Sequence, residues 1–86
     1  MNLSLEQEFT ARAWAGELVD AIELGPIFVE RWLREKMDKN TEMCKELYVG
    51  LVFKAMDAQN YELSVGMILI AASLGWDTIA KDIISW

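Results

Sequence analysis

The chain has 86 residues, of which 53% are hydrophobic, and it carries a formal net charge of −6, a single cysteine and no histidine. A domain of this size has little interior, so part of the apolar surface is expected to lie at an interface with a partner or a second copy. The acidic balance argues against nucleic-acid binding, and the composition lacks the usual general base, the commonest metal ligand and any disulfide framework.

The first predicted helix begins in the stretch SLEQEF, residues 4–9. Ser4 is a good N-cap, Gln7 completes a capping box, and Glu6 suits the positive end of a helix. An apolar stripe follows at helical spacing: Leu5, Phe9, Ala11, Trp14, Ala15, Leu18, Val19 and Ile22. The pair Gly25-Pro26 predicts the turn that ends this helix.

The next segment, residues 26–58, has a helical apolar pattern in two parts. The residues are Ile27, Phe28, Val29, Trp32, Leu33, Lys36 and Met37, and then Cys44, Leu47, Tyr48, Leu51, Val52, Ala55 and Met56. Asn40 and Thr41 between them can each cap a new helix, so the pattern allows one helix or two. The absence of Gly and Pro around this point favours a single helix.

Charged residues on the same segment predict an ordinary solvated surface. They are Arg31, Arg34, Lys36 and Lys39, alternating with Glu30, Glu35 and Asp38.

The last third predicts two shorter helices. AQN at 58–60 is a turn signal, and Asn60 can cap the apolar segment YELSVGMILIAASLG, whose end is marked by Gly75. WDTIAKDIISW, residues 76–86, adds a further amphipathic pattern. We therefore expect an all-α protein, a helical hairpin followed by two short helices, in a single domain over 1–86. With no signal-peptide pattern and no apolar run long enough to span a membrane, we expect it to be soluble and cytoplasmic.

The residue types present do not form a catalytic pattern. Cys44 lies on an apolar stripe and is expected to be a small buried hydrophobe. The spacing of Glu42 and Glu46 is that of a solvated helix face. The glycines stand singly, without a phosphate-binding loop. We expect no enzyme activity, no cofactor and no metal, and a protein-binding module as the default.

The chain opens with LSLEQEF, followed by Arg12 and an aromatic at Trp14. This opening resembles the start of the NblA family (Ycf18 in plastids) of phycobilisome degradation proteins. Further positions of that family fall on Leu18, Gly25-Pro26, Leu33, Met37 and the run Lys45-Glu46-Leu47. The resemblance covers residues 1–50. Residues 51–86 are then the end of the second helix and a C-terminal helical extension.

The resemblance implies a two-helix hairpin that dimerises, and a non-enzymatic adaptor. Such an adaptor binds phycobiliproteins of the light-harvesting antenna and links them to a Clp-type chaperone–protease. The implied partner-binding residues are Leu47, Lys45, Glu46 and Tyr48. The residues expected in dimer or core packing are Leu5, Phe9, Trp14, Leu18, Trp32, Leu33 and Met37. The amino-terminal region is the candidate for dimer or chaperone contact.

Departures from the family pattern leave other functions open: Cys44 stands where the family has a tyrosine, and the family's closing Trp-Gly has no counterpart after Gly50. Val49 stands where the family usually has Lys, which predicts weaker antenna binding, and the extension can fold over the face that ordinary members use. A diverged or phage-encoded relative with another target is one alternative. A small acidic inhibitor or antitoxin-like protein that blocks a basic surface is another, and a structural subunit of a larger assembly is the third. Binding by an acidic inhibitor should weaken steeply with salt, whereas hydrophobic adaptor contacts should not.

Overall fold

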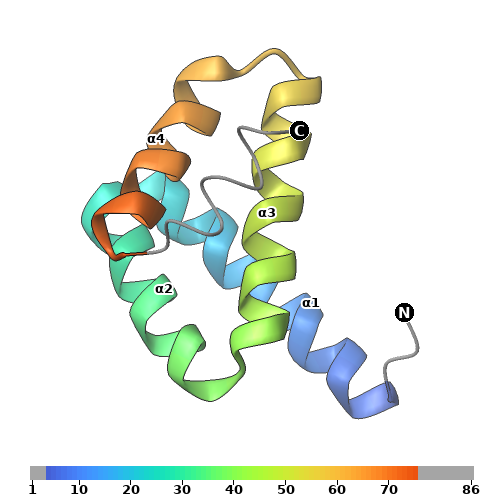
Figure 1. Ribbon diagram of the computed structural model, residues 1–86. Coiled ribbons are helices and arrows are strands. Elements are labelled where there is room, and N and C mark those ends of the chain that lie inside the picture. The colour runs from blue at the N-terminus through green and yellow to red at the C-terminus, as the bar shows by residue number, and fades with distance from the viewer. Residues whose placement is uncertain (1–3, 76–86) are drawn as a thin grey trace.

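The computed structural model describes residues 4–75, and these fold into four helices, as Figure 1 shows. The helices are α1 (Leu5–Leu24), α2 (Pro26–Lys39), α3 (Thr41–Asp57) and α4 (Tyr61–Ser73). The described residues contain no strand, so the all-α class predicted from the sequence is confirmed. The predicted helix within WDTIAKDIISW lies outside the described residues.

The predicted start and end of α1 are both confirmed. The Ser4 side chain accepts a hydrogen bond from the backbone N–H of Gln7 at 3.2 Å, and the Gln7 side chain accepts one from the backbone N–H of Ser4 at 3.0 Å. These two bonds are the predicted capping box. At the other end Gly25 has φ +129°, a conformation that residues with a Cβ rarely adopt. The chain can therefore turn sharply there and enter α2 at Pro26.

The prediction of one helix over 26–58 was wrong, because the helix breaks at Asn40. The backbone of Asn40 is extended, with φ −158° and ψ 97°, and its N–H closes α2 by bonding to the Lys36 carbonyl. Its side chain then accepts a hydrogen bond from the backbone N–H of Met43 at 3.1 Å and so caps α3. The cap replaces the helical bonds that a break removes, so no glycine or proline is needed.

Helix α4 begins and ends as the sequence predicts. The Asn60 side chain caps it by accepting from the N–H of Leu63 at 3.3 Å. The helix ends at Ser73, and Gly75 just beyond it has φ +83°, as expected for the glycine that follows a helix.

The core lies where α2 packs on the other three helices. Helix α2 contacts α1, α3 and α4, and α3 contacts α1 and α4, whereas no Cα atoms of α1 and α4 lie within 8 Å of each other. The buried cluster that joins the helices consists of Leu18, Ala21, Val29, Trp32, Leu33, Cys44, Tyr48, Val52, Met67 and Ala71. Leaving α1 and α4 apart opens a space on that side of the bundle.

Polar groups hold this core in register. The indole N–H of Trp32 donates to the Trp14 carbonyl at 3.1 Å, which ties α2 to α1. The hydroxyl of Tyr48 donates to the Met67 carbonyl at 2.5 Å, which ties α3 to α4. The rings of Trp32 and Tyr48 stack with centroids 6.5 Å apart. Buried Tyr and Trp usually find such partners, because an unpaired polar group in the core is costly.

The charged surface of α2 is partly as predicted. Arg34 pairs with Glu30 at 2.9 Å and Lys39 with Glu35 at 3.2 Å, both as exposed i, i+4 pairs. Lys36 is the exception to the predicted solvated surface, because it is only 5% exposed. It belongs to the apolar stripe on which the spacing also places it.

Candidate functional site

Two of the four partner-binding residues implied by the resemblance, Glu46 and Leu47, line a seam between α1 and α3. One hollow of about 520 Å³ is lined by Ala15, Leu18, Val19, Glu46, Leu47, Gly50, Leu51, Phe53, Lys54 and Asp57. A second hollow of about 340 Å³ is lined by Gln7, Ala11, Asn40, Glu42, Met43, Glu46 and Leu47. Glu46 and Leu47 line both hollows, so they stand at the junction of one continuous seam.

The lining of this seam is mainly apolar, with a few charged residues. Its floor is aliphatic and aromatic, and its rim carries Glu46, Asp57 and Lys54. Val19 on the α1 side is 45% exposed, so the floor remains accessible to solvent. Burial of such apolar area stabilises a complex by about 25 cal/mol per Å², and charged residues beside it fix the orientation of the bound partner.

Two of the four implied partner-binding residues do not line the seam. Lys45 is half-buried and absent from the lining of both hollows. Tyr48 is 0% exposed and belongs to the core cluster. Its place in the partner-binding set is therefore corrected, because an enclosed ring cannot touch a partner. The one-residue step from Leu47 turns the side chain by about 100° and moves it from the surface to the core.

The residues predicted for core or dimer packing divide into two groups. Leu18, Trp32 and Leu33 are buried, and Trp14 and Met37 pack against the buried cluster. Leu5 and Phe9 are 69% and 61% exposed, so of the two predicted roles, core or dimer packing, only dimer packing stays open for them. They lie in the amino-terminal part of α1, ahead of the first α1 residue in the core, Leu18. Their apolar side chains remain available to a partner.

The single thiol is a core residue, as predicted. Cys44 is 0% exposed. Burial raises the pKa of the thiol to about 11, and the positive charge of Lys36 offsets only part of this effect. Since the thiolate is the nucleophilic form, Cys44 is unreactive at neutral pH.

The buried Lys36 is held by groups from α1 and α2. Its ammonium lies 2.8 Å from the Glu17 carboxylate and 3.4 Å from that of Glu35. It also lies 5.3 Å from the centre of the Trp14 ring, a cation–π distance. Burial alone would lower the pKa of Lys36, but the hydrogen bonds and charges of Glu17 and Glu35 outweigh this and raise it. The amine is charged and paired, so it serves the structure rather than acting as a base.

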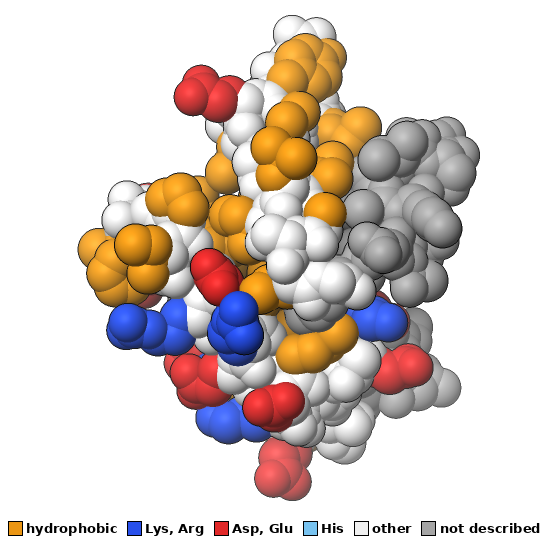
Figure 2. Space-filling view, turned by 60° about the vertical axis from the view of Figure 1, so that its left-hand side comes forward, with side chains coloured by type: hydrophobic (Ala, Val, Ile, Leu, Met, Phe, Trp, Pro, Cys, Tyr) orange, Lys and Arg blue, Asp and Glu red, His pale blue; other side chains and the backbone are white. Residues whose placement is uncertain are grey.

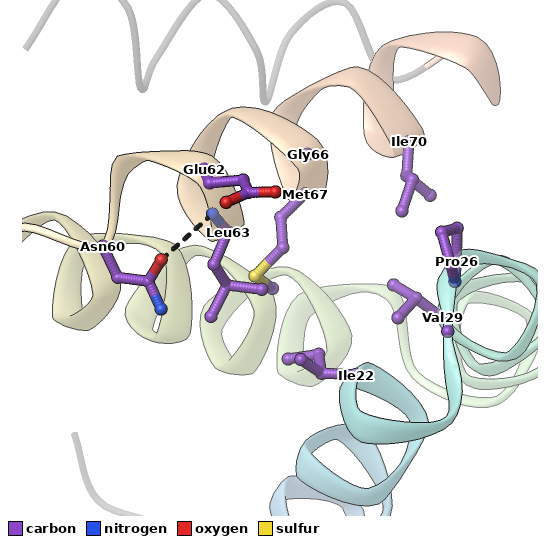
Figure 3. A pocket seen from close by; sticks show the side chains of 10 residues that line it. Ile22, Pro26, Val29, Asn60, Glu62, Leu63, Gly66, Met67 and Ile70 are labelled. Carbon is purple, nitrogen blue, oxygen red and sulfur yellow. Dashed lines mark hydrogen bonds between the residues drawn. The ribbon is translucent and has the colours of Figure 1, made fainter.

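A third hollow, which the sequence did not predict, lies between the α1–α2 turn and α4. It has a volume of about 310 Å³ and is shown in Figure 3. Its lining is Ile22, Gly25, Pro26, Val29, Asn60, Glu62, Leu63, Gly66, Met67 and Ile70. We call it the α4 groove. A signal for it existed in the sequence: Gly66 inside an apolar helix marks a place where something can approach the backbone closely.

The comparisons with known proteins add no relative. No family model matches the chain, and no curated protein and no solved structure matches it either. The resemblance to the NblA family therefore stays a prediction from the residues quoted above. None of the four described helices combines the length and apolar content needed to cross a bilayer. Over residues 4–75, no three Cys, Asp or Glu side chains gather in a way that could hold a metal ion.

Proposed function

We propose that this protein is a non-enzymatic adaptor of the NblA type, which binds phycobiliproteins through the α1–α3 seam. The observation that carries the proposal is the position of Leu47. The resemblance names this residue as the antenna contact, and it lies where the two hollows of the seam meet. A residue chosen from a sequence pattern alone could equally have fallen in the core, as its neighbour Tyr48 does.

The remaining parts of the proposal follow the same resemblance. The exposed Leu5 and Phe9 offer a separate apolar surface at the start of α1 for the Clp-type chaperone. An adaptor needs two such surfaces, one for the cargo and one for the chaperone. The adaptor is proposed to act in the cytoplasm as a homodimer.

The test mixes the purified chain with phycobiliprotein and follows pigment absorbance by size-exclusion chromatography with light scattering. Co-elution is expected for the wild type, and its loss for Leu47→Asp. Because Leu47 also packs against the core, Glu46→Lys is the second variant, since this residue lines the same hollows and is exposed. Leu24→Asp is the matched control, because Leu24 is 65% exposed and lines neither hollow.

Circular dichroism of each variant shows whether its helices are intact. Antenna binding that survives in both Leu47→Asp and Glu46→Lys contradicts the seam as the contact. Separate elution of the wild-type chain and phycobiliprotein contradicts the adaptor function itself.

Salt distinguishes this proposal from the acidic inhibitor. The formal net charge of −6 suits a basic partner surface. Contacts of that kind weaken between roughly 0.1 and 1 M salt, where the screening length falls from about 10 Å to about 3 Å. A complex that persists across this range supports an apolar contact, and a complex that dissociates favours the inhibitor.

A further inference from the structure

Helix α4 carries large apolar side chains on its exposed side as well as on the side that packs against the core. Ser64 and Ala71 are 2% and 0% exposed, and Met67 is the only long side chain buried between them. The outward residues Tyr61, Val65 and Leu69 are 59%, 52% and 64% exposed. They are four apart, so they form one ridge along the helix. A helix that served only the core of a monomer would carry polar residues at these exposed positions.

The α4 groove runs beside this ridge on the same helix. Its α4 side is formed by Leu63, Gly66 and Ile70, and its other side by the α1–α2 turn (Figure 3). A Cβ added at Gly66 would meet no atom within 4 Å, so the backbone there is open to a neighbour. The space-filling view shows the apolar side chains gathered along α4 and, separately, at the α1–α2 turn (Figure 2). One surface thus carries both a ridge and a groove.

We propose that this surface is the interface between two copies of the chain, with the α4 helices antiparallel and the ridge of each copy seated in the α4 groove of the other. In a two-fold interface each patch meets its own copy, so one face must supply both the projecting and the receiving shape. Ridge and groove are neighbours on α4, which meets that requirement. The resemblance to the NblA family ends near Gly50 and says nothing of α4.

The charges on α4 are compatible with self-pairing. Glu62 is its only charged residue, near the N-terminal end, and Ser73 is its last residue. With Gly66 of one copy opposite Leu69 of the other, Glu62 faces Ser73 of the second copy. The two Glu62 carboxylates are then separated along the axis by 11 residues at 1.5 Å each, about 16 Å. This is more than a screening length at physiological salt, so like charges do not oppose the pairing.

The same features argue against a charged partner. Twelve of the thirteen residues of α4 are uncharged, so a strongly basic or acidic ligand would find almost no opposite charges to pair with there. The contact is centred on a single short helix, so it lies at the small end of protein interfaces, below roughly 1,200 Å² in total. We therefore expect a dimer that dissociates in the micromolar range.

The first test is sedimentation velocity of the full chain over a dilution series from about 1 to 500 μM, a range that brackets a micromolar dissociation constant. The mass is expected to rise from 9.8 kDa towards twice that value. Leu69→Asp and Gly66→Leu are expected to stay monomeric at all concentrations, the first by placing a charge on the ridge and the second by filling the groove. Both positions are open to solvent or empty space, so the fold is retained.

Two controls match these variants. Ile27→Asp places the same charge on an equally exposed apolar residue, at 71%, outside the α4 groove. Gly16→Leu makes the same change on α1, where an added Cβ also meets no atom within 4 Å. Both are expected to dimerise like the wild type. A wild-type chain that stays monomeric at 500 μM overturns the proposal. The proposal is also overturned if Ile27→Asp or Gly16→Leu abolishes the dimer while Leu69→Asp and Gly66→Leu still form it.

The second test fixes the antiparallel register. Glu62→Cys and Ser73→Cys proteins are oxidised separately and as an equal mixture, and disulfide-linked dimers are read on a non-reducing gel. The mixture is expected to give at least fivefold more linked dimer than either protein alone, since only unlike positions meet. The wild type is the control for Cys44, which is buried. Equal yields overturn the proposed register and the proposal with it.

This inference rests on the homodimer included in the proposed function and locates its interface. The two tests contain no phycobiliprotein. A negative result therefore overturns the α4 interface alone, and antenna binding keeps its own experiment.

Discussion

The ion pair between Lys36 and Glu17 should be coupled more strongly than any other pair in the described chain. The Lys36 side chain is 7% exposed and that of Glu17 is 54% exposed, so one partner is buried and the other half in water. Fully exposed pairs contribute about 0.2–1 kcal/mol, and breaking a buried pair costs about 3–5 kcal/mol. With one end solvated, we expect about 2 kcal/mol for the coupling, after allowing for screening at Glu17.

A double-mutant cycle measures this coupling. Glu17→Gln leaves the Lys36 ammonium in place with only Glu35, at 3.4 Å, and the Trp14 ring, so it should cost about 2 kcal/mol. Lys36→Met removes the charge and keeps an unbranched side chain of similar length. Its free energy of unfolding should therefore be at most about 1 kcal/mol lower than that of the wild type, or higher. Glu17→Gln added to Lys36→Met should then cost almost nothing.

Urea denaturation followed by tryptophan fluorescence at pH 7 gives each free energy of unfolding. The raised pKa of Lys36 means that its contribution is complete below the ordinary value of 10.5 and is lost as the pH rises through the folded-state value. Neutral pH therefore reports the full coupling. The matched control is the exposed pair of Arg34 and Glu30, for which we expect about 0.3–0.5 kcal/mol. A Lys36–Glu17 coupling no larger than this control would refute the argument from burial.

Three other changes test the core and the helix ends. The pKa of Cys44 lies at about 11 against an ordinary 9.0, so the free energy of unfolding should fall by about 3 kcal/mol between pH 8 and pH 12. Denaturant midpoints should show that Cys44→Ala removes this part of the decrease. Asn40→Ala removes the cap of α3 and should cost about 1 kcal/mol in thermal unfolding, whereas Asn40→Ser should retain most of it. Gly25→Ala should cost about 1–3 kcal/mol because of its positive φ, while Gly16→Ala should be neutral or stabilising by the same measurement.

Local signals in the sequence were enough to predict the helix ends. The caps at Ser4 and Asn60 and the glycines at 25 and 75 act over three or four residues, so they can be recognised without knowing the fold. Asn40 was recognised as a candidate cap, but the choice between a cap and a helix interior depends on tertiary packing. Folding α3 back along α2 brings Val52 and Tyr48 into the same buried cluster as Leu33, and this gain offsets the helical bonds lost at the break.

The sequence could propose single residues of the candidate site, but not the residues of other helices that lie beside them. The resemblance proposes Leu47, but the seam around it also needs α1, which no local signal on α3 reveals. Periodicity assigned Lys36 to an apolar stripe and its charge assigned it to the surface. The structure satisfies both, because the buried ammonium reaches Glu17 on another helix. Partners brought together from different helices are what sequence spacing cannot supply.

Helix α4 is the clearest case in which the fold alone does not explain the sequence. Its apolar pattern goes all the way round, so periodicity could not say which side faces the core. The side with Ser64, Met67 and Ala71 is buried, and Leu63, Ile68 and Ile70 pack partly against the core. Polar residues at Val65 and Leu69 would cost the monomer little, since both are more than half exposed. A chain that keeps valine and leucine there accepts a solubility risk that folding does not require. A second copy of the same helix removes that risk, because it buries ridge and groove together.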